Sequence, residues 1–395
     1  MKRTALIGFL AASVSMLSAQ TWNWKVQRAN EVNARGEAIA QTDFKTDAWI
    51  AAPVPGTVAR AWQEAGKLED IRYDDNLTRI DDGFFNADFW YRTEFDAPAL
   101  KQGERLVLHF DGINWKADVW LNGQSVGRIE GAFVRSHFDI TPFLKTAGRN
   151  ALAVRIYGNE HYGDVKIPTL EQNVPNGGVL GEDNPTMHAS IGWDWLPTVP
   201  GRNIGIWNDV RLTVARGGVE IGDAFMDTSL PGVTPRHPEN AKTAEVSPVI
   251  TLFNYNQEPA DAEIVIRFGE QRITRKARLE PGEHDLALEK FLVEKPRLWW
   301  PVGYGEPYLY DVVVEAKVNG VTLAEKSLKC GIRQMDYTVE NSAIQLYING
   351  RRFIAHGGNW GFSEINLDYT ARDYDIALRY HRDMHLNMVR NWVGQ

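Results

Sequence analysis

The sequence predicts a mainly β protein: two antiparallel β-sandwiches followed by the opening βαβ unit of an incomplete (β/α)8 barrel. Two observations lead to this fold class. Short runs of alternating apolar and polar residues recur over residues 89–328, and tight-turn pairs such as Asn122-Gly123 separate them. After residue 334 the pattern changes to strand, helix and strand. With 395 residues, 44% of them hydrophobic, the chain can bury the cores of two or three domains.

Residues 1–20 have the layout of a cleaved signal peptide. Lys2 and Arg3 precede an apolar run over 5–17, and small or polar residues follow at 18–20. A membrane anchor is the alternative, but the run is shorter than the roughly 20 apolar residues that a spanning helix needs. We therefore expect an exported protein, periplasmic or extracellular, with no membrane contact after the signal is cleaved.

Charge and cysteine content exclude several classes of function. The chain has 43 Lys and Arg against 51 Asp and Glu, and a net charge of −8 provides no basic field for nucleic acid. Cys330 is the only cysteine, which rules out an internal disulfide framework and a cysteine metal cluster. His381 and His385 have the i, i+4 spacing of metal ligands, but no zincin glutamate follows His381 and no third ligand is evident. We expect no nucleic-acid partner, no metal and no cofactor.

The first sandwich is expected over residues 21–216. Alternation is clear in 89–95, and the strand pattern at 117–121 is followed by Asn122-Gly123, a pair that suits the type I′ turn of a hairpin. Repetition of this pattern to about Val214 predicts an antiparallel sandwich.

The second sandwich is expected over residues 217–333. Gly217-Gly218 and a Pro- and Gly-containing stretch at 231–238 suggest a boundary before strands that begin near Val246. Four later runs have the spacing of an immunoglobulin-like sandwich of about 100 residues. These runs are 249–253, 262–268, 308–318 and 322–328.

Residues 334–395 are expected to begin a barrel domain. A strand leads from Phe353 into 357–360, Thr370 and Asp373 cap a helix, and a second strand covers 386–390. The helix face expected to pack on a parallel sheet carries Tyr374, Ala377, Leu378, His381 and Met384.

This last segment is too short to close a barrel, which needs about 250 residues. Roughly 55 residues after Asn341 can supply only the opening strands. A lone βαβ unit leaves apolar strand edges unpaired. We therefore expect this segment to be poorly ordered or aggregation-prone in isolation.

Several stretches resemble glycoside hydrolase family 2, and the likeness extends from about Trp24 to Gln395. Those similar to its jelly-roll sugar-binding domain are 111–123 and 138–141. Those similar to its immunoglobulin-like domain are 296–301, 305–310 and 331–333. The β-mannosidase and exo-β-glucosaminidase branch, rather than the β-galactosidase branch, is resembled at 192–195, 205–210, 357–360 and 387–392.

The resemblance implies retaining hydrolysis of β-mannosides or β-glucosaminides, with a β-linked carbohydrate as partner. In this family the acid/base and the nucleophile are glutamates on later barrel strands, so we assign no catalytic residue and expect the chain alone to be inactive. Retaining hydrolysis needs two carboxyls about 5 to 5.5 Å apart. Asn159-Glu160 has the family's acid/base dipeptide but follows a strand of the first sandwich, while Asp74-Asp75 and Asp81-Asp82 are typical of surface loops.

Sugar-binding residues are easier to propose, because carboxylates hold hydroxyl pairs and indole faces cover the apolar side of a sugar ring. Asp194 and Trp195 lie beside Trp193 in a loop that, by the resemblance, reaches the barrel mouth. The alternative is that both tryptophans fill a domain interface.

Barrel sites lie at the carboxyl ends of the strands. We therefore expect sugar contacts from Asn359 and Trp360 on the first strand and from Asn391 and Trp392 on the second. Trp392 matches a subsite tryptophan by resemblance, whereas Arg390 is equally suited to structural ion pairs. Glu364 departs from the aspartate that the branch usually carries.

Two other readings stay open. The chain could be a non-catalytic carbohydrate-binding protein that uses the 193–195 loop as a lectin site. It could also be a fragment whose downstream reading frame encodes the missing strands.

Overall fold

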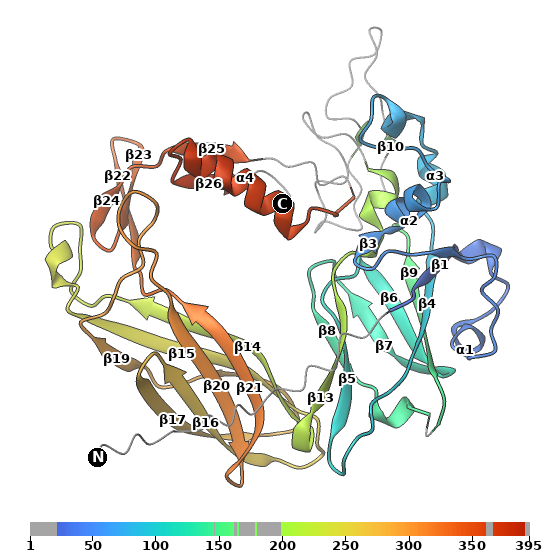
Figure 1. Ribbon diagram of the computed structural model, residues 1–395, viewed down its shortest axis with the longest axis horizontal. Helices are drawn as coiled ribbons and strands as arrows, with labels where there is room; N and C mark the ends of the chain where they lie inside the picture. The colour runs from blue at the N-terminus through green and yellow to red at the C-terminus, as the bar shows by residue number, and fades with distance from the viewer. Residues whose placement is uncertain are drawn as a thin grey trace, which may run out of the picture.

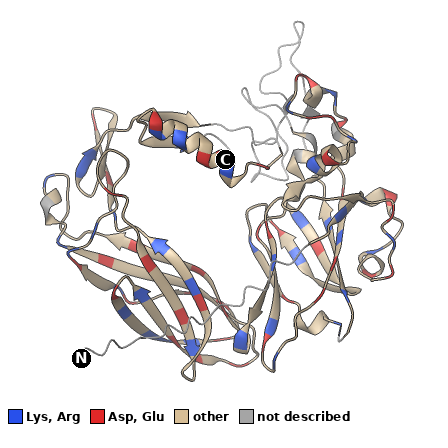
Figure 2. Ribbon diagram, in the orientation of Figure 1, with Lys and Arg blue, Asp and Glu red and all other residues tan. Residues whose placement is uncertain are grey.

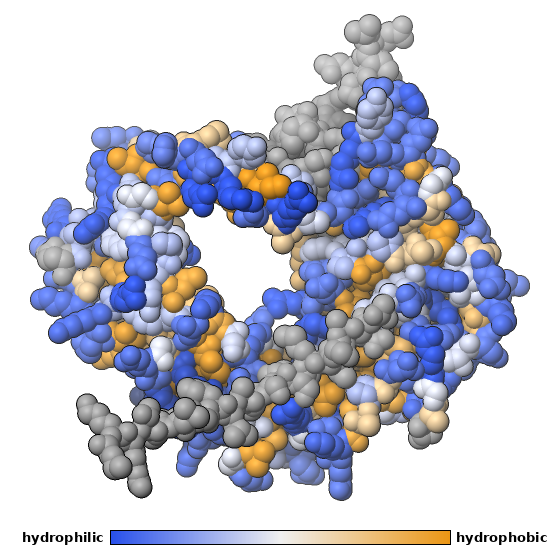
Figure 3. All heavy atoms as spheres, viewed as in Figure 1, coloured by the Kyte–Doolittle hydropathy of each residue, from blue (hydrophilic) through white to orange (hydrophobic). Residues whose placement is uncertain are grey.

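Two sandwiches and a short α/β unit form a ring around a central opening (Figures 1 and 3). This arrangement comes from a computed structural model. It describes residues 22–145, 147–161, 164–165, 178–179, 199–360 and 366–391. The predicted mainly β fold class is confirmed, since strands form both sandwiches and the longest helix among the described residues lies in the last unit.

The first domain is an antiparallel sandwich with a six-stranded and a three-stranded sheet. The larger sheet has the order β2-β1-β4-β9-β6-β7, and the smaller one has the order β13-β5-β8. Phe89, Tyr91 and Phe110 are fully buried in the core between them. The strands are β1 (Lys25–Arg28), β2 (Ile50–Ala51), β4 (Phe89–Phe95), β5 (Arg105–Phe110), β6 (Lys116–Leu121), β7 (Gln124–Glu130), β8 (Ser136–Asp139), β9 (Asn150–Tyr157) and β13 (Val210–Ala215).

The predicted hairpin joins β6 and β7. Asn122 and Gly123 have φ values of 51° and 83°, the positive pair that a type I′ turn requires. The hairpin prediction is therefore confirmed at the level of backbone geometry.

Short helices and strand pairs lie outside the two sheets of this domain. Thr57 accepts a hydrogen bond from the backbone of Arg60 (3.1 Å) and so caps α2. Trp62 of α2 packs edge-on against Phe84 and Phe85. The elements are α1 (Gly36–Ile39), α2 (Val58–Glu64), α3 (Asp82–Phe85), η6 (Pro200–Asn203), β3 (Gly56–Thr57) paired with β12 (Gly205–Ile206), and β10 (Asp164–Val165) paired with β11 (Gly178–Val179).

The second domain is also a sandwich, with β14-β15-β18 and β19 in one sheet and β17-β16-β20-β21 in the other. Its first strand begins at Val219, within the expected range 217–333 but ahead of the strands expected from near Val246, so the stretch 231–238 lies inside the sandwich. Pro and Gly mark any tight connection and not only a domain boundary. The strands are β14 (Val219–Ser229), β15 (Thr243–Asn254), β16 (Ala260–Phe268), β17 (Gln271–Leu279), β18 (Gly282–Ala287), β19 (Phe291–Glu294), β20 (Tyr310–Val318) and β21 (Val321–Cys330).

The third unit contains the predicted βαβ arrangement. β25 (Gly357–Trp360) and β26 (Met388–Asn391) pair in parallel, and α4 (Ala371–Asp383) connects them. Thr370 and Asp373 form the expected capping box at the start of α4.

Two features of this unit differ from the prediction. An antiparallel sheet of β22 (Met335–Glu340), β23 (Ala343–Ile348) and β24 (Arg351–Phe353) precedes it, so Phe353 ends a strand instead of opening one. On α4, Tyr374, Ala377 and His381 are half-buried, whereas Leu378 and Met384 are exposed. Two described parallel strands are too narrow to cover the whole predicted face.

Charges of both signs are interspersed over both sandwiches, with no extended face of one sign in this view (Figure 2). No helix in the described part of the chain is long and apolar enough to cross a membrane. The predicted signal peptide, residues 1–20, lies outside the described residues.

Candidate functional site

The carboxyl ends of β25 and β26 face the first domain. In Figure 1 the segment before α4, residues 366–370, reaches the end of the jelly-roll that carries α2 and β3. The Thr57 hydroxyl donates a hydrogen bond to Asn366 Oδ1 (3.4 Å), and Asn366 Nδ2 donates to Gln63 Oε1 (3.3 Å). Arg72 and Asp368 form an ion pair between the same two regions. The segment before α4 therefore contacts the first domain directly.

Asn359 and Arg390 lie opposite each other at these strand ends. Arg390 Nη1 donates a hydrogen bond to Asn359 Oδ1 (3.0 Å), and the two residues are paired in register. Both side chains are exposed. Their amide and guanidinium groups offer donors of the kind that sugar hydroxyls accept.

Trp360 has different surroundings from its neighbour. Its ring is half-buried and lies 6.0 Å from the ring of Tyr374 and 5.5 Å from that of His381, centre to centre. Because successive side chains of a strand point to opposite faces, Trp360 packs on α4 while Asn359 lies on the other face. Asn391 is in register with Trp360, and its side chain lies outside the description.

Three predicted binding residues, Asp194, Trp195 and Trp392, lie outside the described residues, as do Trp193 and Glu364. The described chain resumes four positions after Trp195, at Val199. Val199 is fully buried and packs in a small cluster with Ile71.

His381 and His385, which have metal-ligand spacing in the sequence, do not lie on one helix, because α4 ends at Asp383. His381 Nδ1 donates to the carbonyl of Ala377 (2.8 Å) within α4, whereas His385 follows the end of the helix with a φ of 60°. Among the described residues, no three His, Cys, Asp or Glu side chains converge as a metal site.

The carboxylates singled out in the sequence lie in loops or at the starts of short helices. Glu160 is exposed just after β9. Asp81 accepts a hydrogen bond from the backbone of Gly83, and Asp75 pairs with Arg79. These contacts are typical of surface turns.

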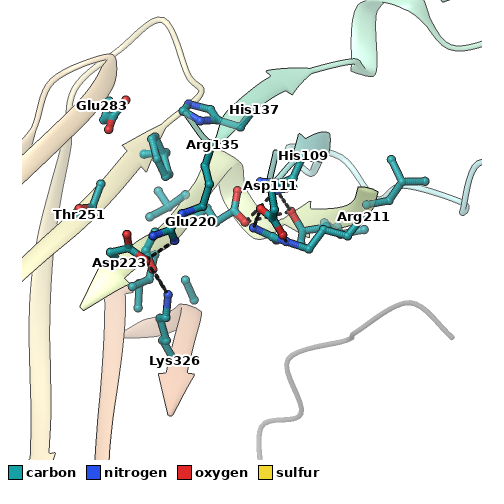
Figure 4. A pocket seen from close by; sticks show the side chains of 18 of the residues that line it. His109, Asp111, Arg135, His137, Arg211, Glu220, Asp223, Thr251, Glu283 and Lys326 are labelled. Atoms are coloured by element: carbon teal, nitrogen blue, oxygen red, sulfur yellow. Dashed lines mark hydrogen bonds and ion pairs between the residues drawn. The ribbon is translucent and has the colours of Figure 1, made fainter. Parts of the chain in front are cut away.

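A groove of about 950 Å³ separates the two sandwiches, and sequence reasoning missed it (Figure 4). Its charges pair with one another: Arg211 with Asp111 (3.1 Å), and both Arg135 (2.9 Å) and Lys326 (3.5 Å) with Asp223. These groups come from segments that are distant in the sequence, so no local pattern predicts them. Only the pair of Arg135 with Asp223 joins the two sandwiches, and the other two pairs lie within one sandwich each.

Glu220 is the most buried carboxylate of this interface. It lies 3.3 Å from His109 Nε2 and accepts hydrogen bonds from the hydroxyls of Thr213 (2.9 Å) and Tyr255 (3.1 Å). Burial alone would raise the pKa of Glu220, but the hydrogen bonds and the His109 charge together lower it. The same carboxylate, together with burial, raises the pKa of Tyr255, and burial lowers the pKa of His137 nearby.

Comparison with known proteins places both sandwiches in one family. Residues 24–208 match the glycosyl hydrolase 2 galactose-binding domain-like family, and residues 230–333 match glycosyl hydrolases family 2. The mannosylglycoprotein endo-beta-mannosidase of Lilium longiflorum is 29% identical over 94% of this chain and 40% of its own length. The exo-beta-D-glucosaminidase of Streptomyces avermitilis is 27% identical over 98% of this chain and 40% of its own.

Solved structures have the same fold. The exo-chitosanase of Amycolatopsis orientalis matches with a TM-score of 0.76 and 22% identity, over 95% of this chain and 40% of that one. The beta-D-mannosidase of Dictyoglomus thermophilum matches with a TM-score of 0.70 and 21% identity, over 94% and 43%. The chain thus spans about 40% of the length of the curated relatives above.

Proposed function

The chain belongs to glycoside hydrolase family 2, and from that premise we propose that it supplies the sugar-binding side of a retaining β-mannosidase or β-glucosaminidase site. Its relatives include enzymes named for both substrates. The observation that carries the proposal is the contact between residues 366–370, which follow β25 in the chain, and residues 57–72 of the jelly-roll. Barrel sites lie at the carboxyl ends of the strands, so this contact supports a sugar site to which both domains contribute.

In this proposal, sugar hydroxyls are bound by side chains from both domains. Asn359 presents an exposed amide, oriented by Arg390. Trp360, packed between Tyr374 and His381, supports the strand end from the α4 side. The further binding residues that we propose are Asp194, Trp195, Asn391 and Trp392.

In this proposal the residues of β25 and β26 bind the sugar, and the catalytic groups that hydrolyse it lie on other strands. A retaining mechanism needs one carboxyl to protonate the leaving oxygen and a second to attack the anomeric carbon. β25 reads Gly-Gly-Asn-Trp and β26 reads Met-Val-Arg-Asn, so neither strand carries a carboxylate. We propose that these two strands bind substrate and that further barrel strands provide both carboxylates.

The experiment is release of nitrophenol from p-nitrophenyl β-D-mannoside and β-D-glucosaminide by the purified polypeptide 1–395. We expect no turnover above the uncatalysed rate, because binding and positioning cannot replace both carboxyls. Clear turnover that survives repurification would contradict this division of labour.

Non-catalytic carbohydrate binding is the second candidate. The exposed Asn359 and Arg390 favour it, because they offer hydrogen bonds on β25 and β26, two strands that themselves carry no acid. Calorimetry with mannose and chitosan oligosaccharides measures this directly. Heat of binding without hydrolysis supports it, and no heat at millimolar ligand counts against it.

We also propose that the protein is exported through residues 1–20. Amino-terminal sequencing of the protein recovered outside the cytoplasm should begin near Gln20 or Thr21. Recovery of full-length chain in the cytoplasm alone would contradict export.

A further inference from the structure

We propose that residues 366–370 form a latch that fixes the jelly-roll domain over the carboxyl ends of β25 and β26, with Asn366 as a positioning residue for the sugar site. The effect on sugar binding rests on the function proposed above. The latch itself is a contact between two parts of the chain and can be tested without any sugar.

Asn366 is built into the jelly-roll surface although it belongs to the barrel segment. Its side chain is 0% exposed, and both ends of its amide are used: Oδ1 accepts from Thr57, and Nδ2 donates to Gln63. Thr57 is itself 1% exposed. Buried polar groups are costly unless they are hydrogen-bonded. Separation of the two domains would therefore expose these polar groups to water or leave them without their hydrogen-bond partners.

Thr57 links the latch to the framework of the jelly-roll end. Its hydroxyl caps α2 through the backbone of Arg60, and its backbone pairs with Gly205 of β12. The chain enters β12 from η6, which contacts α2. Val199, just before η6, is buried four positions after Trp195. Thr57, which donates to Asn366 of the latch, is thus paired with β12, a strand that follows the predicted sugar-binding residues 193–195 in the chain.

A second contact, two residues further along the latch, also joins it to the jelly-roll. Asp368 forms an ion pair with Arg72, and the backbone of Arg72 donates to Asp70 Oδ1 (3.0 Å), which restrains its loop. Arg79 lies seven residues later and pairs with Asp75 inside the same domain. Arg79 is therefore a matched control for Arg72: both are arginines that pair with an aspartate, but only one pair joins the domains.

The latch affects the affinity for sugar by changing the fraction of molecules in which the two domains are correctly placed. If a sugar contacts both domains, the apparent Kd equals the intrinsic Kd divided by the fraction of molecules with the domains correctly placed. Loss of two buried hydrogen bonds is enough to shift the equilibrium between correctly and incorrectly placed domains about tenfold. The apparent Kd then rises by up to about tenfold, and it rises most where the correct arrangement is only partly populated.

The test compares polypeptide 1–395 with the variants Asn366→Ala, Arg72→Asp, Asp368→Arg, the double swap of the last two, and the control Arg79→Asp. Hydrogen exchange measured by mass spectrometry reports the latch through peptides that cover α2 and residues 366–370. Calorimetry with p-nitrophenyl β-D-mannoside and β-D-glucosaminide reports the sugar site.

We expect Asn366→Ala and each single charge reversal to speed exchange in both peptides about tenfold, the double swap to restore protection, and Arg79→Asp to change nothing. Unchanged exchange in Asn366→Ala, or no rescue by the swap, would overturn the latch. Where the unaltered chain binds a sugar, the same variants should raise Kd by up to about tenfold, and an unchanged Kd would overturn the positioning role. Absence of sugar binding by the unaltered chain contradicts the proposed function, and exchange alone then decides the latch.

Discussion

The first sandwich and the last segment of the chain bury apolar side chains to very different extents. In the sandwich, β4 and β9 each have a neighbour on both sides, and Phe89, Tyr91 and Phe95 are fully buried. In the last segment, β25 and β26 have only each other as described partners, and Tyr380 of α4 is 66% exposed. The sandwich completes its core from its own residues, whereas the last segment does not.

The difference follows from the kind of sheet that each region forms. An antiparallel sheet can bury one face and leave the other in water, so a few strands suffice. Parallel strands are usually covered on both faces, and barrel strands also need neighbours on both edges. A βαβ unit alone meets neither requirement. Its stability must come from whatever covers it, which includes the latch to the jelly-roll.

The largest expected effect is a core truncation in the sandwich. Phe110→Ala should lower the free energy of unfolding of this domain by about 3 to 5 kcal/mol, because it removes a fully buried ring from a packed core. Tyr380→Ala, the matched change on α4, should cost less than about 0.5 kcal/mol. Denaturant unfolding followed by fluorescence measures both. Similar losses at the two positions would show that the two regions are equally well packed.

The next effect concerns local opening. Amides of β26 should exchange at least about a hundredfold faster than amides of β9, because the two-stranded sheet can open without disturbing the sandwich core. Peptides from β20, a central strand of the second sandwich, serve as a protected control. Equal protection in all three strands would contradict the comparison, and would mean that the last segment opens only with the rest of the molecule.

Local signals were sufficient for features whose cause is local. Asn122-Gly123 predicted a type I′ turn because few residue pairs adopt two successive positive φ angles easily. Thr370 and Asp373 predicted the start of α4 because a capping box satisfies backbone groups within one turn. β22 carries a readable alternation of Met335, Tyr337 and Val339 with polar residues that the prediction passed over.

Other features depend on contacts between distant positions. Asn366 and Thr57 are 309 residues apart, and nothing near either residue marks it as one side of a domain contact. The same holds for Glu220 and His109, which meet only because two sandwiches pack. Of the predicted binding residues, Asn359 could be placed at a strand end from pattern alone. The packing of Trp360 against α4 depends on the position of the helix relative to β25, which the sequence pattern does not specify.

A smaller effect on stability, one that depends on pH, should distinguish the contact between the two sandwiches from their apolar cores. The pKa of Glu220 is lowered in the folded chain relative to its ordinary value of 4.5, so its stabilising contribution is present above about pH 4.5 and is lost as the pH falls through the folded pKa. Glu220→Gln should remove about 1.5 to 3 kcal/mol from the coupling of the two domains at neutral pH. It should also flatten the dependence of that coupling on pH below 4.5. Thermal unfolding of both proteins between pH 3 and 7 measures this, and a parallel acid response in the variant would rule out Glu220 as its source.

The smallest effect on stability should come from substitution of the exposed apolar residues of α4. These substitutions test whether their side chains contribute to a packed core. Leu378→Lys and Tyr380→Lys should change the unfolding free energy by less than about 0.5 kcal/mol, because neither side chain contributes to a closed core. Self-association of polypeptide 1–395 should nevertheless fall, since both changes break an exposed apolar surface. Sedimentation velocity over a range of concentrations measures association, and Arg379→Lys on the same helix preserves charge as the control. A large loss of stability without any change in association would mean that α4 is packed against the chain more closely than its exposed side chains indicate, and the contrast with the sandwich would then have to be abandoned.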